Sequence, residues 1–231
     1  MSQINVANVI ASIQRKLKDG SYGDELVLSM INNAILFIVN TIRPQSLGRP
    51  MVEITTITGS SPTELPDDML FPYIIAVMDS DSLPMHFSTR MTDLDFLQST
   101  SSPVSRKAAL FGYGGIYLFP VEDRGEKIFV TYLVSPEEIP TTTSLTDSFS
   151  FGPAPFVQDA VIAYVCREIY GEIEDGVDGR KVNTDKYHAL LLSNMSAISQ
   201  AVGQASLAAR PEVIGFSAFE ATGMTNEFGV L

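Results

Sequence analysis

The sequence predicts an α+β fold: an antiparallel helical bundle core with helices from both chain ends, a β-rich insertion and an extended C-terminal arm. Apolar residues repeat with helical spacing only in residues 1–50 and 151–203. Between them, residues 51–150 carry short β-branched or aromatic segments separated by turn residues. Residues 204–231 keep neither period for long. We therefore divide the chain at these boundaries.

Two further helices are predicted at the amino terminus. From Asn5 onward the apolar residues fall on one helical face, and Gly20 is expected to end this helix. Asp24 is expected to cap the next helix, which continues until Pro44. Neither helix can bury its apolar face alone. We expect this hairpin to pack on the C-terminal hairpin as a four-helix core.

Several segments of the insertion predict strands closed by turns: VEITTIT, IIAVMDS, PMHFSTR, GIYLF and EKIFVTYLV. The last of them, residues 126–134, is at least partly apolar on both faces, which favours a central place in a sheet. The GYGG run at 112–115 is interpreted as a hairpin turn, and residues 93–99 as a short helix. The aperiodic residues 136–155 are expected to return the chain to the core.

The C-terminal hairpin lies within residues 155–203, where an acidic, Gly-containing loop joins two apolar helices. The first, 155–173, has so broad an apolar surface that it must be covered on two sides. The second, from about Thr184, repeats apolar residues at intervals of four, four, three and four, which predicts a seam for a neighbouring helix. These seam residues are Tyr187, Leu191, Met195, Ile198 and Val202.

Charge limits the partners of the chain. The net charge is −12, and residues 51–150 alone carry fourteen acidic and five basic groups. Such a surface repels phosphates, so specific nucleic-acid recognition through a basic patch is not expected. The acidic region is either an ordinary solvent-exposed surface or the lining of a channel through which nucleic acid passes without binding. No stretch reaches eighteen uninterrupted apolar residues and no signal peptide is apparent, so neither membrane insertion nor secretion is expected.

No catalytic, cofactor or metal site is predicted. His86 and His188 are far apart in the sequence and are expected to be surface or half-buried residues, while Cys166 is expected to be a small buried hydrophobe. The loop at 172–178 is rich in acids but lacks the ligand spacing of an EF-hand. A metal-dependent hydrolase using this loop remains an alternative. The acids of the loop are Glu172, Glu174, Asp175 and Asp178.

The C-terminal arm, residues 204–231, contains large apolar residues without a period. A disordered tail is usually short of aromatics, so we expect this arm to order against another surface. The surface is either a partner subunit or the core of the same chain. The predicted docking residues are Ile214, Phe216, Phe219, Met224, Phe228 and Leu231.

The order in which these features follow one another along the chain resembles that of a known protein family. The second helix has the pair Asn33-Ala34 and ends at Arg43-Pro44, and the first strand is followed by GSSPTELPDD with its Leu65–Asp68 run. The paired strands GIYLFPVEDRGEKIFVTYLVSPEEIP and the hairpin FVQDAVIAYVCREIYGEIED…KYHALLLSNM follow. Over most of residues 4–203, this order resembles the head-to-tail connector or adaptor proteins of tailed bacteriophages.

The resemblance implies a structural virion protein and not an enzyme. It implies a homo-oligomeric ring of about twelve copies, a closed cyclic assembly, under the portal protein at the capsid vertex. Such a ring extends the DNA channel without binding DNA specifically and offers a platform to tail or nozzle proteins. The chain would be made in the host cytoplasm, and its arm would reach the portal. The alternative is a tail-completion or tail-tube component of the same virion.

Overall fold

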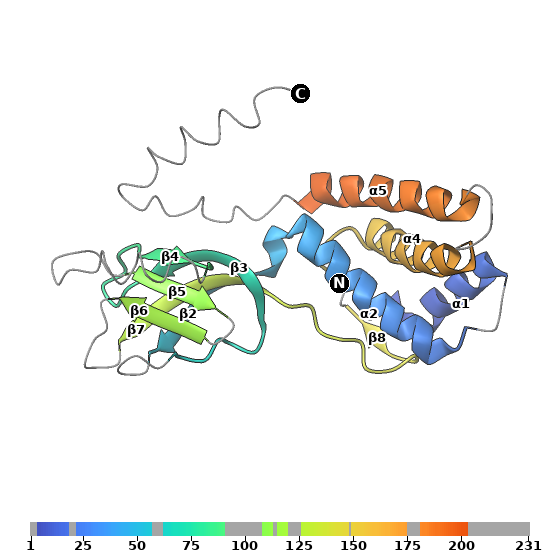
Figure 1. Cartoon of the computed structure of the whole chain (residues 1–231). Coiled ribbons are helices and arrows are strands. Elements are labelled where there is room, and N and C mark those ends of the chain that lie inside the picture. Colours follow the sequence, from blue (N-terminus) through green and yellow to red (C-terminus); the bar gives the residue numbers. More distant parts are fainter. Residues whose placement is uncertain are drawn as a thin grey trace, which may run out of the picture. The chain divides into compact units, whose positions relative to one another are not determined.

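The computed structural model describes residues 4–18, 22–56, 62–90, 108–112, 115–119, 126–147, 149–174 and 181–202. Within them the fold is mixed α/β, with four α-helices and three small sheets (Figure 1), so the predicted mixed class is confirmed. The chain divides into two compact units. A helical unit lies within Met1–Leu47 and Ser135–Ala205, and a strand unit lies within Gly48–Val134.

Helix α4 (Ala154–Ile173) is at the centre of the helical unit. It contacts α1 (Val6–Leu17), α2 (Asp24–Ile42) and α5 (Val182–Val202), and Figure 1 shows it between α5 and the first two helices. Coverage of α4 on two sides, predicted from its broad apolar surface, is therefore confirmed. Its buried residues are Val157, Ala160, Val161, Ile162, Ala163, Val165, Cys166 and Ile169.

The outer helices pack on α4 through narrower stripes. Helix α5 buries the predicted seam residues Tyr187, Leu191, Met195 and Ile198, and Val202 is half-buried. Helix α1 buries all five of its large apolar residues: Val6, Val9, Ile10, Ile13 and Leu17. In α2 the apolar stripe predicted from spacing is partly wrong, since Leu26 is 50% exposed while Leu28 and Val39, which are outside that stripe, are buried. The predicted stripe consists of Leu26, Val27, Met30, Ile31, Ala34, Ile35, Ile38 and Ile42. A helix that is apolar on most sides does not reveal from sequence which face meets the core.

The helix boundaries differ from the predicted ones. Helix α1 ends at Leu17, because Lys18 adopts a left-handed conformation (φ 56°) and its N–H bonds the Gln14 carbonyl, so the end expected at Gly20 is wrong. Gly23 and not Asp24 precedes the first turn of α2. The Asp24 carboxylate instead accepts a hydrogen bond of 2.7 Å from the Gln14 side chain. This contact ties α1 to α2.

Helix α2 is long and apolar enough to cross a membrane, by length and composition alone. The buried core helix of a globular protein meets the same criterion. Here α2 contacts α4, and its Ala34, Ile35 and Ile38 are buried in the helical unit. A left-handed Arg43 (φ 54°) closes α2, and the short 3₁₀ helix η1 (Gln45–Leu47) follows Pro44.

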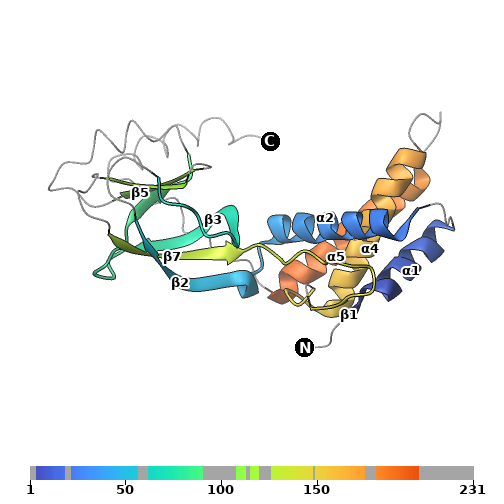
Figure 2. The same ribbon diagram turned by 90° about the horizontal axis from the view of Figure 1, so that it is seen from below.

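The return segment is part of the helical core. Its strand β8 (Leu145–Thr146) pairs antiparallel with β1 (Ile4–Asn5), and Phe149 and Phe151 are buried. Figure 2 shows this segment, in yellow, beside the helices. The side-chain amide of Asn32 on α2 donates to the Ile139 carbonyl at 3.1 Å and accepts from the Ile139 N–H at 3.0 Å. The expected connection without periodicity is thus fixed to the core by paired hydrogen bonds.

The described residues of the strand unit form two three-stranded sheets. In the first, β7 (Lys127–Val134) lies between β2 (Gly48–Thr55) and β3 (Met69–Met78), so the predicted central place of β7 is confirmed. In the second, β5 (Ala108–Gly112) pairs with both β4 (His86–Ser88) and β6 (Gly115–Phe119). Strand β5 was not predicted from the sequence. The predicted helix at 93–99 lies outside the described residues.

The GYGG hairpin is confirmed, since Gly112 pairs with Gly115 in the antiparallel β5–β6 register. Gly115 has φ +120°, and a Cβ there would lie 2.2 Å from the Thr63 carbonyl oxygen. Thr63 and Ile116 exchange two backbone hydrogen bonds of 2.9 and 2.7 Å. Only glycine permits this close approach.

Candidate interaction surface

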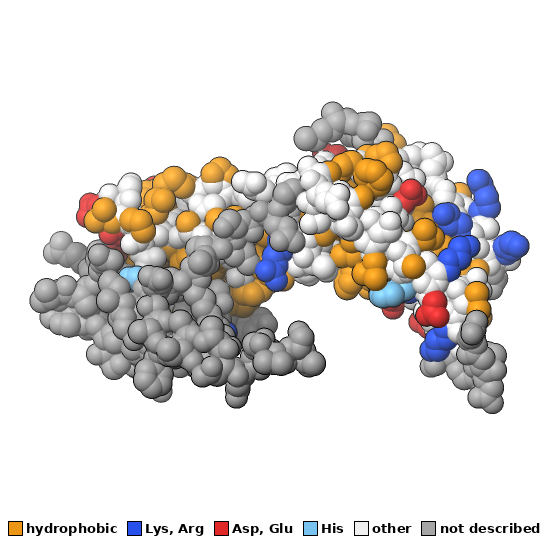
Figure 3. Space-filling view, turned by 90° about the horizontal axis from the view of Figure 1, so that it is seen from above, with side chains coloured by type: hydrophobic (Ala, Val, Ile, Leu, Met, Phe, Trp, Pro, Cys, Tyr) orange, Lys and Arg blue, Asp and Glu red, His pale blue; other side chains and the backbone are white. Residues whose placement is uncertain are grey.

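Large hydrophobic side chains are exposed chiefly on three helices of the helical unit. Figure 3 looks onto α5 and shows hydrophobic side chains among mostly uncharged ones, with a few Asp or Glu side chains and with the Lys and Arg of the helical unit gathered toward one end. Helix α1 exposes none of its large hydrophobic residues. Single exposed hydrophobics are normal, whereas a concentration on adjacent helices marks an interaction surface. The residues are Leu26, Leu36 and Phe37 on α2, Phe156 and Ile173 on α4, and Val182, Leu190 and Leu192 on α5.

Two of these three helices, α2 and α5, lack charged residues over long stretches. No Asp, Glu, Lys or Arg occurs on α2 from Leu26 to Ile42, or on α5 from Tyr187 to Val202. Helix α1 instead places Arg15 and Lys16 in its last turn. In a chain of net charge −12, two such long helical stretches without Asp, Glu, Lys or Arg are a marked local departure.

A surface aromatic cluster fixes one part of this region. The rings of Phe37 on α2 and Tyr164 on α4 lie 5.1 Å apart between centroids. The Arg167 guanidinium carbon lies 5.7 Å from the Phe37 centroid and 4.9 Å from that of Tyr164. Arg167 also donates to the Glu168 carboxylate, and burial raises the pKa of Tyr164. Phe37 is therefore a restrained aromatic side chain that remains 36% exposed, which is typical of an anchor in a protein interface.

The loop between α4 and α5 is organised by Glu174, whose carboxylate caps α5. One oxygen accepts from the backbone N–H and side-chain amide of Asn183, at 3.1 and 3.0 Å. The other accepts from the N–H and hydroxyl of Thr184, at 3.0 and 2.7 Å. These bonds, that of the Thr184 hydroxyl above all, lower the pKa of Glu174 to about 2. Glu174 thus acts as a helix cap, and Asp175 and Asp178 lie outside the described residues.

Cys166 is buried, as predicted. Burial raises the pKa of its thiol to about 11, although Lys16 and Lys186 oppose this shift. Nearby, the rings of Tyr170 and Tyr187 stack with 5.6 Å between centroids and a 9° interplanar angle. A neutral thiol in this setting is a packing group and a poor nucleophile.

The structure places the two histidines apart from any cluster of metal ligands. His86 is half-buried in β4 and His188 is exposed on α5, as predicted. Within the described residues, no group of three or more His, Cys, Asp or Glu side chains is placed to hold a metal ion.

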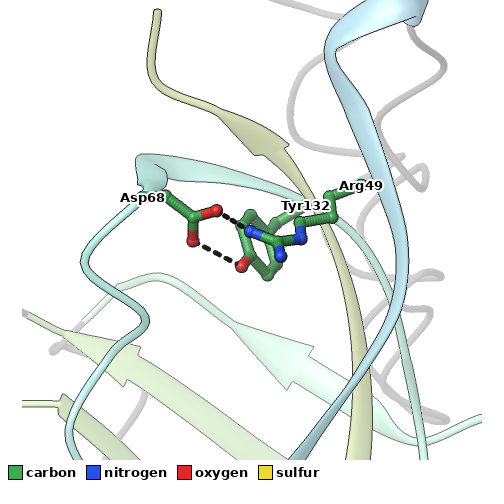
Figure 4. Close-up of polar contacts among 3 residues, drawn as sticks. All are labelled: Arg49, Asp68 and Tyr132. Carbon is green, nitrogen blue, oxygen red and sulfur yellow. Dashed lines mark hydrogen bonds and ion pairs between the residues drawn. The ribbon is translucent and has the colours of Figure 1, made fainter. Parts of the chain in front are cut away.

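The strand unit has one prominent polar network (Figure 4). Asp68 accepts hydrogen bonds from the Tyr132 hydroxyl, at 2.7 Å, and from the Arg49 guanidinium. The Tyr132 bond is the largest cause of the lowered pKa of Asp68, while burial of the hydroxyl raises the pKa of Tyr132 to about 12. The network joins β2, β7 and the Leu65–Asp68 run. It gives this run, one of the features behind the resemblance, a structural role.

Comparison with known proteins identifies the family. The family model described as SU10 adaptor protein matches residues 4–212, which include the described parts of both units. The chain belongs to the SU10 adaptor protein family. This is a family of phage head-to-tail adaptors, so the resemblance drawn from the order of sequence features is confirmed. No curated protein matches the chain.

Membership in the SU10 adaptor family defines a general role. It implies a structural adaptor at the virion neck that interacts with portal and tail components. A structural family is consistent with a non-enzymatic protein. The family match ends at residue 212, before Ile214. The docking residues predicted between Ile214 and Leu231 lie beyond this match and outside the described residues, so they stay a prediction.

Sequence reasoning missed the residues that organise the helical surface of this adaptor. Phe37 lies outside the apolar stripe predicted for α2. An aromatic residue on the side opposite a buried stripe is itself a sign of an interaction surface. Arg167 and Glu174 gave no local signal. The contact of Arg167 with Phe37 joins two helices, and the contact of Glu174 with Thr184 crosses the interhelical loop, so only the folded chain brings these pairs together.

Proposed function

We propose that this SU10-family adaptor forms a closed ring of about twelve copies beneath the portal. The ring extends the DNA channel from the capsid vertex and provides the attachment platform for the tail. The observation that carries this proposal is the family match over residues 4–212.

The charge of the chain supports a channel that does not retain DNA. Proteins hold DNA mainly by neutralising phosphates with Lys and Arg and releasing counterions. A chain with 27 acidic and 15 basic side chains offers little net attraction of this kind. DNA therefore passes such a ring without specific binding.

We also propose that residues 204–231 form an arm that docks on the portal. The arm carries three phenylalanines, Phe216, Phe219 and Phe228, in a segment with few charges. Arms that order on binding cover a large surface at modest affinity, and several arms in one ring add avidity.

Native mass spectrometry of the adaptor mixed with portal rings from the same phage tests the ring. Saturation at one adaptor per portal subunit is the expected result. Absence of any complex would overturn the proposal. If the adaptor alone then formed long tubes, it would be a tail-completion or tail-tube component.

Changes in the arm test its portal contact separately. Replacing Phe216, Phe219 and Phe228 with Ser is expected to weaken portal binding at least tenfold, because aromatic anchors dominate interface energies. Replacing the polar Thr222, Thr225 and Asn226 with Ala is the matched control and should change binding little. Equal affinities of both triple variants would refute the arm. Circular dichroism should show unchanged helix content in both.

A further inference from the structure

We propose that the exposed face of α5 in one adaptor copy packs against the exposed face of α2 in the next copy. This assignment rests on the proposed ring and names its lateral contact. It uses only the helical unit, in which α2, α4 and α5 all contact one another.

The α5 face consists of small and uncharged residues flanked by leucines. Ala189, Ser193 and Ser196 are exposed on it, and none is part of the seam that packs on α4. Leu190 and Leu192 are 42% and 54% exposed on either side. Small residues on an uncharged helix allow another helix to approach closely.

The α2 face is formed by larger side chains. Leu26, Leu36 and Phe37 are 50%, 38% and 36% exposed. Ser29 and Asn33 lie between them on the same side of the helix and are also exposed. Phe37 is held in place by Tyr164 and Arg167, so it loses little conformational freedom when it enters an interface.

Charge favours a second copy as the occupant. Copies of a chain with net charge −12 repel one another, so their contact is most favourable where both surfaces lack charge. The stretches 26–42 of α2 and 187–202 of α5 meet this condition, because they contain no Asp, Glu, Lys or Arg. Arg167, which lies over Phe37 from α4, is itself paired with Glu168.

Size decides how the two faces pair. Large side chains on α2 fit opposite small residues on α5, whereas α2 against α2 would oppose large with large, and α5 against α5 would leave gaps. A contact between two different faces is heterologous, and repeated contacts of this kind close a ring.

Cysteine cross-linking tests the pairing directly. One adaptor preparation carries Asn33→Cys on α2, another carries Ser193→Cys on α5, and both residues are exposed in wild type. The native Cys166 is buried, so it is not expected to cross-link. Mild oxidation of the mixture should give covalent dimers, while each preparation alone should remain monomeric under denaturing electrophoresis. A chain carrying both cysteines should give a ladder of higher oligomers.

The oxidation is performed on the adaptor alone at high concentration and on the adaptor bound to portal rings. Cross-linked dimers from the mixture in either sample support the pairing. Their absence from both samples overturns it. Dimers from one single-cysteine preparation would instead indicate an isologous contact and would also overturn it.

A matched pair of charge variants provides a second readout. Ala189 on α5 and Ala11 on α1 are both exposed helical alanines. Ala189→Glu should weaken self-association roughly a hundredfold, because it forces a carboxylate to lose its water inside the contact. Ala11→Glu should leave self-association unchanged, and both variants should unfold at the same denaturant concentration. Equal association of the two variants, measured by sedimentation, contradicts the assignment.

The outcomes separate this inference from the proposed function. Cross-linking of free adaptor without any portal binding would retain the α2–α5 contact and refute the portal-bound ring. Portal binding at full stoichiometry without cross-linking would retain the ring and refute this pairing. A third outcome concerns the arm. If a charged probe reached α5 only after residues 204–231 were removed, and no cross-link formed, then the arm and not a second copy would cover this face.

Discussion

Helices α1 and α5 both pack on α4, but the side chains on their solvent-facing sides differ in charge. Each buries one narrow apolar stripe, and each stripe contains a completely buried isoleucine, Ile13 or Ile198. Outside that stripe α1 carries basic residues, whereas α5 carries none between Tyr187 and Val202. The core of one chain explains the inner faces of both helices. It does not explain why α5 lacks Asp, Glu, Lys and Arg from Tyr187 to Val202, a stretch that we propose a second copy covers.

Their amino termini are capped in different ways. The Asn5 side chain caps α1 by accepting a hydrogen bond of 3.3 Å from the Asn8 N–H, three residues away. Helix α5 is capped by Glu174, which lies at the C-terminal end of α4. The first cap is local and neutral, and the second is a charged contact across a loop. The two helices should therefore respond differently to pH.

The buried faces of α1 and α5 should contribute similarly to the free energy of unfolding. Ile13→Ala and Ile198→Ala are each expected to lower the free energy of unfolding by about 2–5 kcal/mol, because each removes a fully buried side chain and leaves a cavity. Urea denaturation of the two variants measures both losses. A loss below about 1 kcal/mol for only one of them would show that this helix is not part of a common core.

The return segment should matter to α1 more than to α5, because β8 pairs with β1 directly before α1. Asn32→Ala is expected to cost about 1–3 kcal/mol, because it leaves both backbone groups of Ile139 without their bonds to Asn32. The neighbouring exposed Asn33→Ala is the control and should cost less than about 0.5 kcal/mol. Hydrogen exchange should show faster exchange at Ile139 and at the start of α1.

The local cap of α1 has a smaller expected effect. Asn5→Ala should cost about 1 kcal/mol, the usual loss for an N-cap side chain. The loss should be the same at pH 7 and pH 4, because the amide does not titrate. Thermal unfolding at both pH values measures it, and a loss that depends on pH would argue against a neutral cap.

The cap of α5 should contribute only where its carboxylate is charged. The pKa of Glu174 is about 2 in the folded chain against an ordinary value of 4.5. A lowered folded-state pKa gives stability that is present above pH 4.5 and is lost as the pH falls toward 2. Glu174→Gln should therefore be less stable than wild type at pH 7, and the difference should vanish near pH 2.

Acid titration of the unfolding midpoint measures this difference. The exposed Glu172→Gln on the same helix turn is the matched control and should follow wild type through the whole range. A constant difference between Glu174→Gln and wild type from pH 7 to pH 2 would contradict the charged cap.

Much of the fold could be predicted because the apolar residues repeat with a clear period. All five buried positions of α1 and four of the five seam positions of α5 follow from spacing alone. The central place of β7 follows from its two partly apolar faces. The period of the apolar residues reflects which side chains are buried, and the burial of apolar surface is the dominant favourable contribution to the free energy of folding. The family, too, could be inferred from the order of these elements.

Other features were decided only in the tertiary structure. The sequence did not indicate that α2 turns Leu26 outward, that Asn32 holds Ile139, or that Glu174 caps α5. Each depends on contacts between segments that only the folded chain brings together. Sequence period determines that a helix has an apolar face, but the neighbouring helices determine which face is buried and which is left for a partner.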